Sequence, residues 1–429
     1  MRDASTPSDE GSRPDEGRRP DESRKRPPRG PGVEDAGPAH PLVRWTEGEA
    51  EHSALWRSER GAPPPKTVMV VDDRMSADDA YGLACQGVGL LWRSDYHNAR
   101  QMLVALDRRV VRRPGKARKA AAPAPDRPAG ERFNLERQAR SQRARTLGML
   151  LIELDADYGI ALGRAPDLRQ ACREAWGPGT QRSLVSLREL LGVVGAHEWR
   201  VRGVEIPAAG GRIHPHYGVF APIRGEYVDL VGRAPLPAGA PASLVAFDVG
   251  TGTGVLAAVL ARRGVGRVVA TDQDPRAMAC ARENLERLGF ATRVTLVQAD
   301  LFPEGRANLV VCNPPWVPAR PSSPLEHGIY DPDSRMLRGF LAGLCAHLAP
   351  GGEGWLVLSD LAEHLGLRTR EALLAEFDAA GLIVVGRLEA RPTHARSVDR
   401  SDPLHAARAA EITSLWRLAA RPAAGGPTP

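Results

Sequence analysis

The 429-residue sequence has no apolar run near the roughly 20 residues that a membrane-spanning helix requires. Residues 1–30 also lack the continuous apolar segment of a secretory signal. No Cys-x-x-Cys pair occurs among the five cysteines, which are Cys85, Cys172, Cys280, Cys312 and Cys345. We therefore expect neither a disulfide framework nor a zinc site. Together these absences predict a cytoplasmic protein with reduced cysteines, no bound metal and no membrane contact.

Lysine is scarce as well, and arginine therefore carries the net charge of +6. The four lysines are Lys25, Lys66, Lys116 and Lys119. The planar guanidinium group of arginine suits phosphate and carboxylate partners. A GC-rich genome, however, also encodes arginine in preference to lysine. Composition alone favours this genomic explanation over nucleic-acid binding.

Three stretches hold few large apolar residues and are unlike the rest of the chain. Residues 1–40 and 421–429 are rich in proline, glycine and polar residues, which predicts disordered tails. Residues 112–132 have the composition of a basic Pro/Ala linker. Much of the region 41–240 spaces its apolar residues by three and four, so we predict a mainly helical substrate-recognition region there.

Over residues 241–420 the pattern changes, because short β-branched runs alternate with longer helical patterns. This alternation predicts βαβ units and hence an α/β fold with a mostly parallel, Rossmann-like sheet. Ligands bind such sheets at the carboxyl ends of the strands. The polar residues at those ends are therefore the candidates for a functional site.

The first predicted strand of this region ends near Asp248, and three alternating glycines follow before a helix: Gly250, Gly252 and Gly254. Such glycines let the backbone turn sharply and approach a ligand beside the positive end of the helix. The spacing differs from the Gly-x-Gly-x-x-Gly of dinucleotide sites, and the Asp248 carboxylate would repel a pyrophosphate. The turn therefore favours a ligand with a cationic amino-acid portion and no phosphate.

The next three predicted strands also end in polar residues. Asp272 is placed to accept hydrogen bonds from both hydroxyls of a ribose, and Asp300 to meet the exocyclic amine of an adenine. Asn313 begins the sequence Asn-Pro-Pro-Trp. Each residue alone is also explained by a helix cap or a turn, but four such strand ends in succession favour one shared ligand site.

These residues resemble the class I S-adenosylmethionine-dependent methyltransferases of the small-domain type, over residues 243–418. The resemblance implies a seven-stranded, mostly parallel sheet and S-adenosylmethionine as the cofactor. The implied cofactor-binding residues are Asp248, Gly250, Thr251, Gly252 and Gly254 for the methionine and ribose, Asp272 for the ribose, Asp300 for the adenine, and Asn313.

Asn-Pro-Pro-Trp matches the signature of the branch that methylates the nitrogen of a planar amide or aromatic amine. Such a nitrogen is a poor nucleophile because its lone pair is delocalised. The Asn313 side-chain oxygen and the Pro314 carbonyl would accept its two N–H groups, and Trp316 would stack on its plane. Neither Pro314 nor Pro315 can continue a sheet ladder. The predicted catalytic residues are therefore Asn313, Pro314, Pro315 and Trp316, which act by positioning.

Two segments, 296–316 and 221–231, resemble the protein-(glutamine-N5) methyltransferases that modify release factors. Arg224 and Glu226 match positions of that family, so the resemblance implies that they bind the substrate. After Trp316 the chain departs from the family, because the sequence PLEHGIYDPDSRML replaces a Glu-Pro segment and a Gly-Gly-x-Asp-Gly turn. This departure bears on the substrate, since it leaves the methyl-transfer residues in place.

The alternative is a nucleic-acid amine methyltransferase that acts on adenine N6 or guanine N2 of RNA or DNA, because the same signature serves it. The basic linker favours this alternative, as does an arginine-rich segment whose Arg391, Arg396 and Arg400 are expected in a loop facing phosphates. A third hypothesis, a non-catalytic scaffold, conflicts with the complete set of acids and glycines. We predict an N-methyltransferase for a planar NH₂ group, with a lean toward a protein glutamine.

Overall fold

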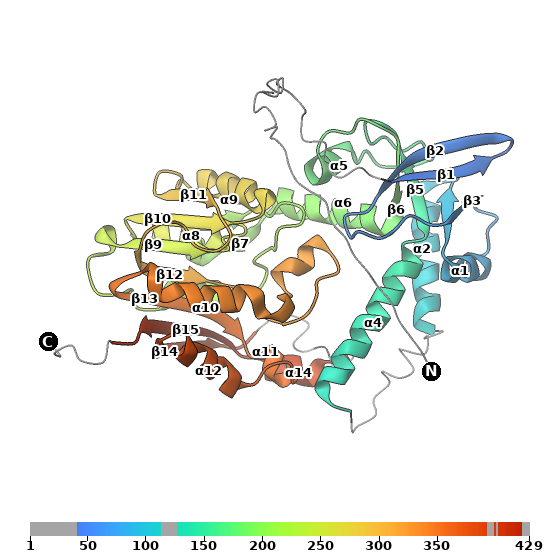
Figure 1. Cartoon of the computed structure of the whole chain (residues 1–429). Coiled ribbons are helices and arrows are strands. Elements are labelled where there is room, and N and C mark those ends of the chain that lie inside the picture. The colour runs from blue at the N-terminus through green and yellow to red at the C-terminus, as the bar shows by residue number, and fades with distance from the viewer. Residues whose placement is uncertain (1–40, 113–126, 393–398, 400–401, 423–429) are drawn as a thin grey trace, which may run out of the picture. The chain divides into compact units, whose positions relative to one another are not determined.

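The computed structural model describes residues 41–112, 127–392, 399 and 402–422 (Figure 1). The predicted tail at 1–40, most of the predicted linker and most of the predicted C-terminal tail lie outside these residues. Within the described ranges, most strands belong to two large sheets, one in the N-terminal and one in the C-terminal part.

The C-terminal part is built on a seven-stranded sheet with the order β11-β10-β9-β12-β13-β15-β14 (Figure 1). Its strands are β9 (Val245–Val249), β10 (Arg267–Asp272), β11 (Val294–Gln298), β12 (Ala307–Cys312), β13 (Leu348–Ser359), β14 (Leu382–Ala390) and β15 (Thr413–Ala420). Neighbouring strands from β11 to β13 run parallel, whereas β15 runs antiparallel to both β13 and β14. The predicted seven-stranded, mostly parallel sheet is therefore confirmed.

The helices of this part are α7 (Glu226–Arg233), α8 (Val255–Arg262), α9 (Pro275–Arg287), α10 (Arg335–His347), α11 (Leu361–His364), α12 (Arg370–Ala379) and α14 (His405–Ala410). Every residue of α8 except Arg262 is buried, as expected of a helix that is apolar on all sides. Helix α9 begins after Asp274, whose side chain accepts the backbone N–H of Arg276. Asp274 is therefore the helix cap, and Asp272 is not needed for that role.

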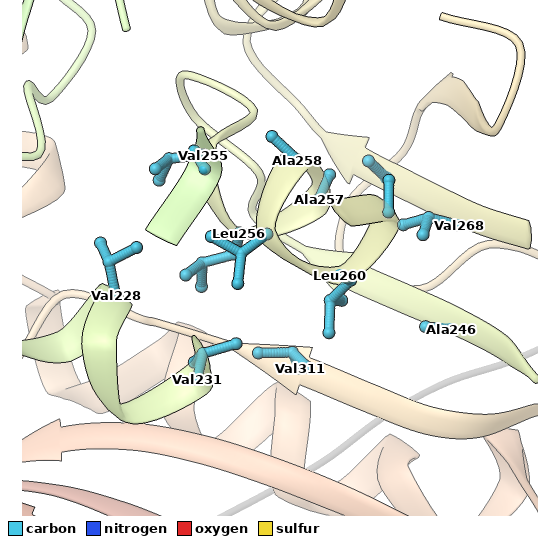
Figure 2. Packing of buried hydrophobic residues seen from close by; sticks show 14 of the residues in the cluster. Val228, Val231, Ala246, Val255, Leu256, Ala257, Ala258, Leu260, Val268 and Val311 are labelled. Atoms are coloured by element: carbon cyan, nitrogen blue, oxygen red, sulfur yellow. The ribbon is translucent and has the colours of Figure 1, made fainter. Parts of the chain in front are cut away.

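The main core of this part lies between α7, α8 and the strands β9, β10 and β12. Val231 of α7 points toward Val311 of β12 (Figure 2). Each fully buried valine or leucine stabilises the fold by about 1.5–3 kcal/mol. Because α7, Ile206 and Ile213 belong to this core, it extends upstream of the domain boundary predicted at residue 241.

The N-terminal part contains, besides its helices, a sheet that we did not predict, which has six strands in the order β1-β2-β6-β5-β4-β3. Its strands are β1 (Leu42–Glu47), β2 (Ala50–Arg57), β3 (Thr67–Val71), β4 (Val88–Trp92), β5 (Leu150–Leu154) and β6 (Ser183–Ser186). Its helices are α1 (Ala77–Gln86), α2 (Tyr96–Arg112), α4 (Ala129–Leu147), α5 (Arg169–Trp176) and α6 (Leu187–Arg202), and a hairpin of β7 (Val204–Ile206) and β8 (Gly211–Ile213) follows. The sheet was missed because strands of four to eight residues cannot be told from buried helix segments by periodicity.

The predicted linker at 112–132 also needs a correction at its end. Helix α4 already begins at Ala129, with Glu131 in its first turn, where a negative side chain stabilises a helix. Phe133 is buried, so this turn is anchored by packing. Residues 129–132 are therefore helical. Among the helices of the described ranges, none combines the length and apolar character needed to cross a bilayer.

Candidate active site

The glycine-rich turn after β9 has the sharp change of backbone direction that the sequence predicts. Gly250, Gly252 and Gly254 have φ angles of 73°, 55° and 80°, in the left-handed region that favours glycine. At Gly252 no heavy atom lies within 4 Å of the position that a Cβ would take. At Gly250 a Cβ would lie 2.4 Å from the methyl carbon of Met336. The turn therefore offers open backbone at Gly252, with the side chain of Met336 beside it.

The Asp248 carboxylate is buried beneath this turn with one oxygen unpaired. Its Oδ2 atom accepts hydrogen bonds from Thr251 Oγ1 at 2.6 Å and from the backbone N–H of Ala257 at 3.0 Å. Its Oδ1 atom has no hydrogen-bond partner among the described residues. Burial raises the pKa of Asp248 to about 6. An unpaired buried acceptor is costly, and a ligand that donates a hydrogen bond would satisfy it.

Asp272 lies next to the glycine turn, at the end of β10. Its carboxylate accepts the backbone N–H of Gly252 and that of Asp274, both at 3.0 Å. Burial raises the pKa of Asp272. Asp300 follows β11 and pairs with Arg335 of α10 at 2.5 Å, with its side chain half-exposed. The predicted residues Asp248, Thr251 and Asp272 thus surround one turn, while Asp300 is engaged by a partner that the sequence did not suggest.

These features fit S-adenosylmethionine. Its cationic amino-acid portion would supply a donor for Asp248 Oδ1, and its ribose hydroxyls would reach the Asp272 carboxylate. The open backbone at Gly252 leaves room for a close approach. A buried carboxylate rather than a cluster of cations at the turn suits a ligand without phosphate.

The NPPW segment begins where the ladder of β12 ends. Cys312 is the last paired residue and lies opposite Val249 of β9 in parallel register. Gly250 and Asn313, the residues that follow this last pair, therefore begin the two loops that leave adjacent strands at the same edge of the sheet. The NPPW segment and the predicted cofactor turn thus begin at neighbouring strand ends.

Asn313 and Trp316 are joined by a hydrogen bond that we did not predict. The indole N–H of Trp316 donates to Asn313 Oδ1 at 2.8 Å. An amide oxygen has two lone pairs, so one acceptor position of Asn313 is left for a target NH₂ group. The ring of Tyr227 meets Trp316 edge-on, at 6.5 Å between centroids and 86° between planes.

Arg224, which the resemblance implies as a substrate-binding residue, lies over this tryptophan, and its guanidinium group is already engaged. It donates to both carboxylate oxygens of Glu411, at 3.0 and 2.9 Å, and its Cζ atom lies 5.4 Å from the centre of the Trp316 ring. Glu411 is fully buried and also accepts the Ser359 hydroxyl at 2.6 Å.

Glu226 lies close to this ion pair. Its Oε1 atom is 3.8 Å from Arg224 Nε and has no hydrogen bond within the described residues. Burial raises the pKa of Glu226. Arg396 lies outside the described residues.

Residues 236–381 match the family model described as the methyltransferase small domain. The predicted methyltransferase resemblance is confirmed. S-adenosylmethionine is the cofactor that accompanies this methyltransferase domain.

Several curated relatives match part of this chain. The release factor glutamine methyltransferase of Cereibacter sphaeroides is 34% identical over 167 residues, which cover 34% of this chain and 59% of that protein. The release factor glutamine methyltransferase of Deinococcus radiodurans is 35% identical over 148 residues, which cover 32% of this chain and 50% of that protein. The ribosomal protein L11 methyltransferase of Pelotomaculum thermopropionicum is 56% identical over 69 residues, covering 16% and 22%. The chain thus spans less than two thirds of each of these relatives.

Sequence reasoning missed Glu411, Ser359 and Met336 of the methyltransferase region. Glu411 lies two residues before β15, which runs antiparallel to β13, so β15 begins at the edge where the parallel strands end. An acid before the last strand was therefore a usable signal. Met336 comes from the segment that departs from the glutamine methyltransferases, where Asp331 accepts the N–H groups of Met336 and Leu337 at 3.0–3.1 Å.

Proposed function

We propose that the protein is an S-adenosylmethionine-dependent methyltransferase that methylates the side-chain amide nitrogen of a glutamine in a protein substrate. The observation that carries this proposal is the parallel register of β12 and β9, in which Cys312 lies opposite Val249. This register supports an NH₂ acceptor at Asn313, because the NPPW segment and the turn that fits the cofactor leave neighbouring strand ends at one edge of the sheet.

Each residue of the site would have a separate role that follows from its position. S-adenosylmethionine supplies an electrophilic methyl group when bound. Asn313 Oδ1 and the Pro314 carbonyl would accept the two N–H groups of the target and aim its lone pair toward the cofactor turn. Trp316 would give the planar amide a flat apolar surface. No strong base is needed, because the target proton becomes acidic only as the new bond forms.

The names of the relatives support a protein as the partner. Release factor glutamine methyltransferase and ribosomal protein L11 methyltransferase both name protein substrates. The substrate-binding roles of Arg224 and Glu226 stay predictions. For Glu226 the prediction is supported by its Oε1 atom, which has no hydrogen-bond partner among the described residues. We include a cytoplasmic location in the proposal, because all five cysteines are free thiols.

The test offers tritiated S-adenosylmethionine and the full-length protein to an extract from a strain that lacks the gene. The labelled products are then treated with nuclease or with protease. Label that survives nuclease and is released by protease is the expected result. Label that survives protease and is released by nuclease would replace the glutamine by an RNA or DNA base, and no transfer at all would leave only the scaffold hypothesis.

A further inference from the structure

A continuous chain of contacts links the end of β13 to the NPPW segment. The Ser359 hydroxyl donates to Glu411 at 2.6 Å, and Glu411 holds both terminal nitrogens of Arg224. The guanidinium group of Arg224 lies over the Trp316 ring at 5.4 Å. Trp316 in turn donates to Asn313 at 2.8 Å. Side chains from four separate segments thus form a chain of contacts that ends at the residue that would accept the target N–H group.

The Arg224–Glu411 ion pair holds the guanidinium group of Arg224 in one orientation. A bidentate pair fixes the plane of the guanidinium group as well as its place. Glu411 is fully buried, so the loss of its partner would leave an uncompensated charge in the interior. A cation over an indole face is attracted by the ring's quadrupole. Arg224 therefore contacts one face of Trp316 in a fixed geometry.

The Trp316 ring is thereby held from three directions. Arg224 covers a face, Tyr227 meets the ring edge-on, and Asn313 accepts the indole N–H. Trp316 is partly buried, and a target plane would stack on the part of the ring that stays exposed. The indole hydrogen bond also occupies one lone pair of Asn313 Oδ1 and leaves the other for the target.

We propose that Arg224 and Glu411 are positioning residues, which fix the Trp316 ring and through it the acceptor oxygen of Asn313. This inference rests on the proposed methyl transfer to an NH₂ group. It replaces direct substrate contact as the main role of Arg224, because both terminal nitrogens already donate to Glu411. A misplacement of about 1 Å at a reacting group can slow a reaction roughly 100-fold.

The test exchanges the ion pair for an apolar pair of similar size, Arg224→Met with Glu411→Leu, since such exchanges often preserve stability. Activity is the transfer of label from tritiated S-adenosylmethionine to the protein fraction of an extract from a strain lacking the gene. We expect kcat to fall about 100-fold, with the melting temperature and the cofactor affinity unchanged. If the double variant fails to fold, Ser359→Ala loosens Glu411 alone and should lower kcat less, in the same direction.

Arg263→Met is the matched control. Arg263 lies over Trp355 at 5.7 Å, in the same kind of contact, but at the end of α8 remote from the glycine turn. This variant should keep the wild-type kcat. A second readout needs no substrate: the exchange rate of the Trp316 indole proton, measured by NMR and assigned with Trp316→Phe. Exchange should be faster in the double variant and unchanged in Arg263→Met.

Two results would overturn the proposal. One is a raised KM for the extract protein with an unchanged kcat, which would assign Arg224 to substrate binding. The other is a wild-type kcat together with unchanged indole exchange. A wild-type protein that transfers no label would refute the proposed function instead, and the indole measurement would still decide whether the pair holds Trp316.

Discussion

One strand-end residue from each sheet shows how differently a charged group can be paired. Arg93, directly after β4 of the N-terminal sheet, donates to Glu47 and Glu153 at 2.6–3.1 Å, so its charge is matched by two carboxylates. Asp248, near the end of β9, keeps one buried oxygen without a hydrogen-bond partner among the described residues. A completed network stabilises a fold, whereas an unpaired buried acceptor costs about 1–3 kcal/mol. The comparison supports Asp248 rather than Arg93 as a ligand-binding group.

The largest expected effect comes from Asn313→Ala. Loss of the acceptor oxygen should lower kcat for methyl transfer roughly 100- to 1,000-fold, as for the loss of one positioned polar group in other active sites. Cofactor affinity, measured by titration calorimetry, should stay the same. Asn308→Ala is the matched control near the start of β12, the strand that Asn313 follows, because the Asn308 side chain accepts the backbone N–H of Val245. The assignment of Asn313 as an acceptor for the target NH₂ group would be refuted if Asn313→Ala transferred methyl groups at the wild-type rate.

Asp248→Asn tests whether the unpaired acceptor serves the cofactor. The exchange keeps the shape but removes the charge, and hydrogen bonds to charged groups are worth about 1.5–3 kcal/mol. We expect the Kd for S-adenosylmethionine to rise roughly 10- to 150-fold. Titration calorimetry measures the change, and an unaltered Kd would show that the carboxylate is structural, like Arg93.

Arg93→Met should have the opposite profile. It leaves Glu47 and Glu153 without their shared partner, and Arg93 holds the pKa of Glu47 below its usual value. We expect the free energy of unfolding to fall by about 1–3 kcal/mol, with cofactor affinity unchanged. Urea denaturation measures the free energy of unfolding, and titration calorimetry measures the cofactor affinity. Weaker cofactor binding by Arg93→Met would contradict the purely structural role of Arg93.

The smallest effect concerns pH. Burial raises the pKa of Asp248 to about 6, so the folded protein takes up this proton before the unfolded chain does. Asp248 therefore favours folding increasingly as pH falls from about 6 toward its ordinary value. Cofactor affinity should change the other way, because the carboxylate form is lost, and we expect it to be roughly tenfold lower at about pH 5 than at neutral pH. Asp248→Asn should lack this pH dependence of cofactor binding.

The sequence predicts the C-terminal sheet well, and it points to the candidate site at the strand ends, because the signals are local. Asp248, the glycines, Asp272 and Asn313 each follow a short apolar run, and parallel strands bring such ends to one edge. The six-stranded N-terminal sheet escaped prediction because its strands are too short to show a period. Glu411 escaped because its place beside Arg224 depends on the antiparallel direction of β15, which pairs segments far apart in the sequence.

Tandem mass spectrometry of the methylated product tests the central claim most directly. The wild-type protein, S-adenosylmethionine and the extract of the deletion strain are incubated, and the labelled product is isolated and fragmented. We expect one added methyl group on the side-chain nitrogen of a glutamine. The Asn313→Ala variant should give no methylated product. A methyl group on carbon or oxygen would contradict the assignment of Asn313 and Pro314 as acceptors for an NH₂ group.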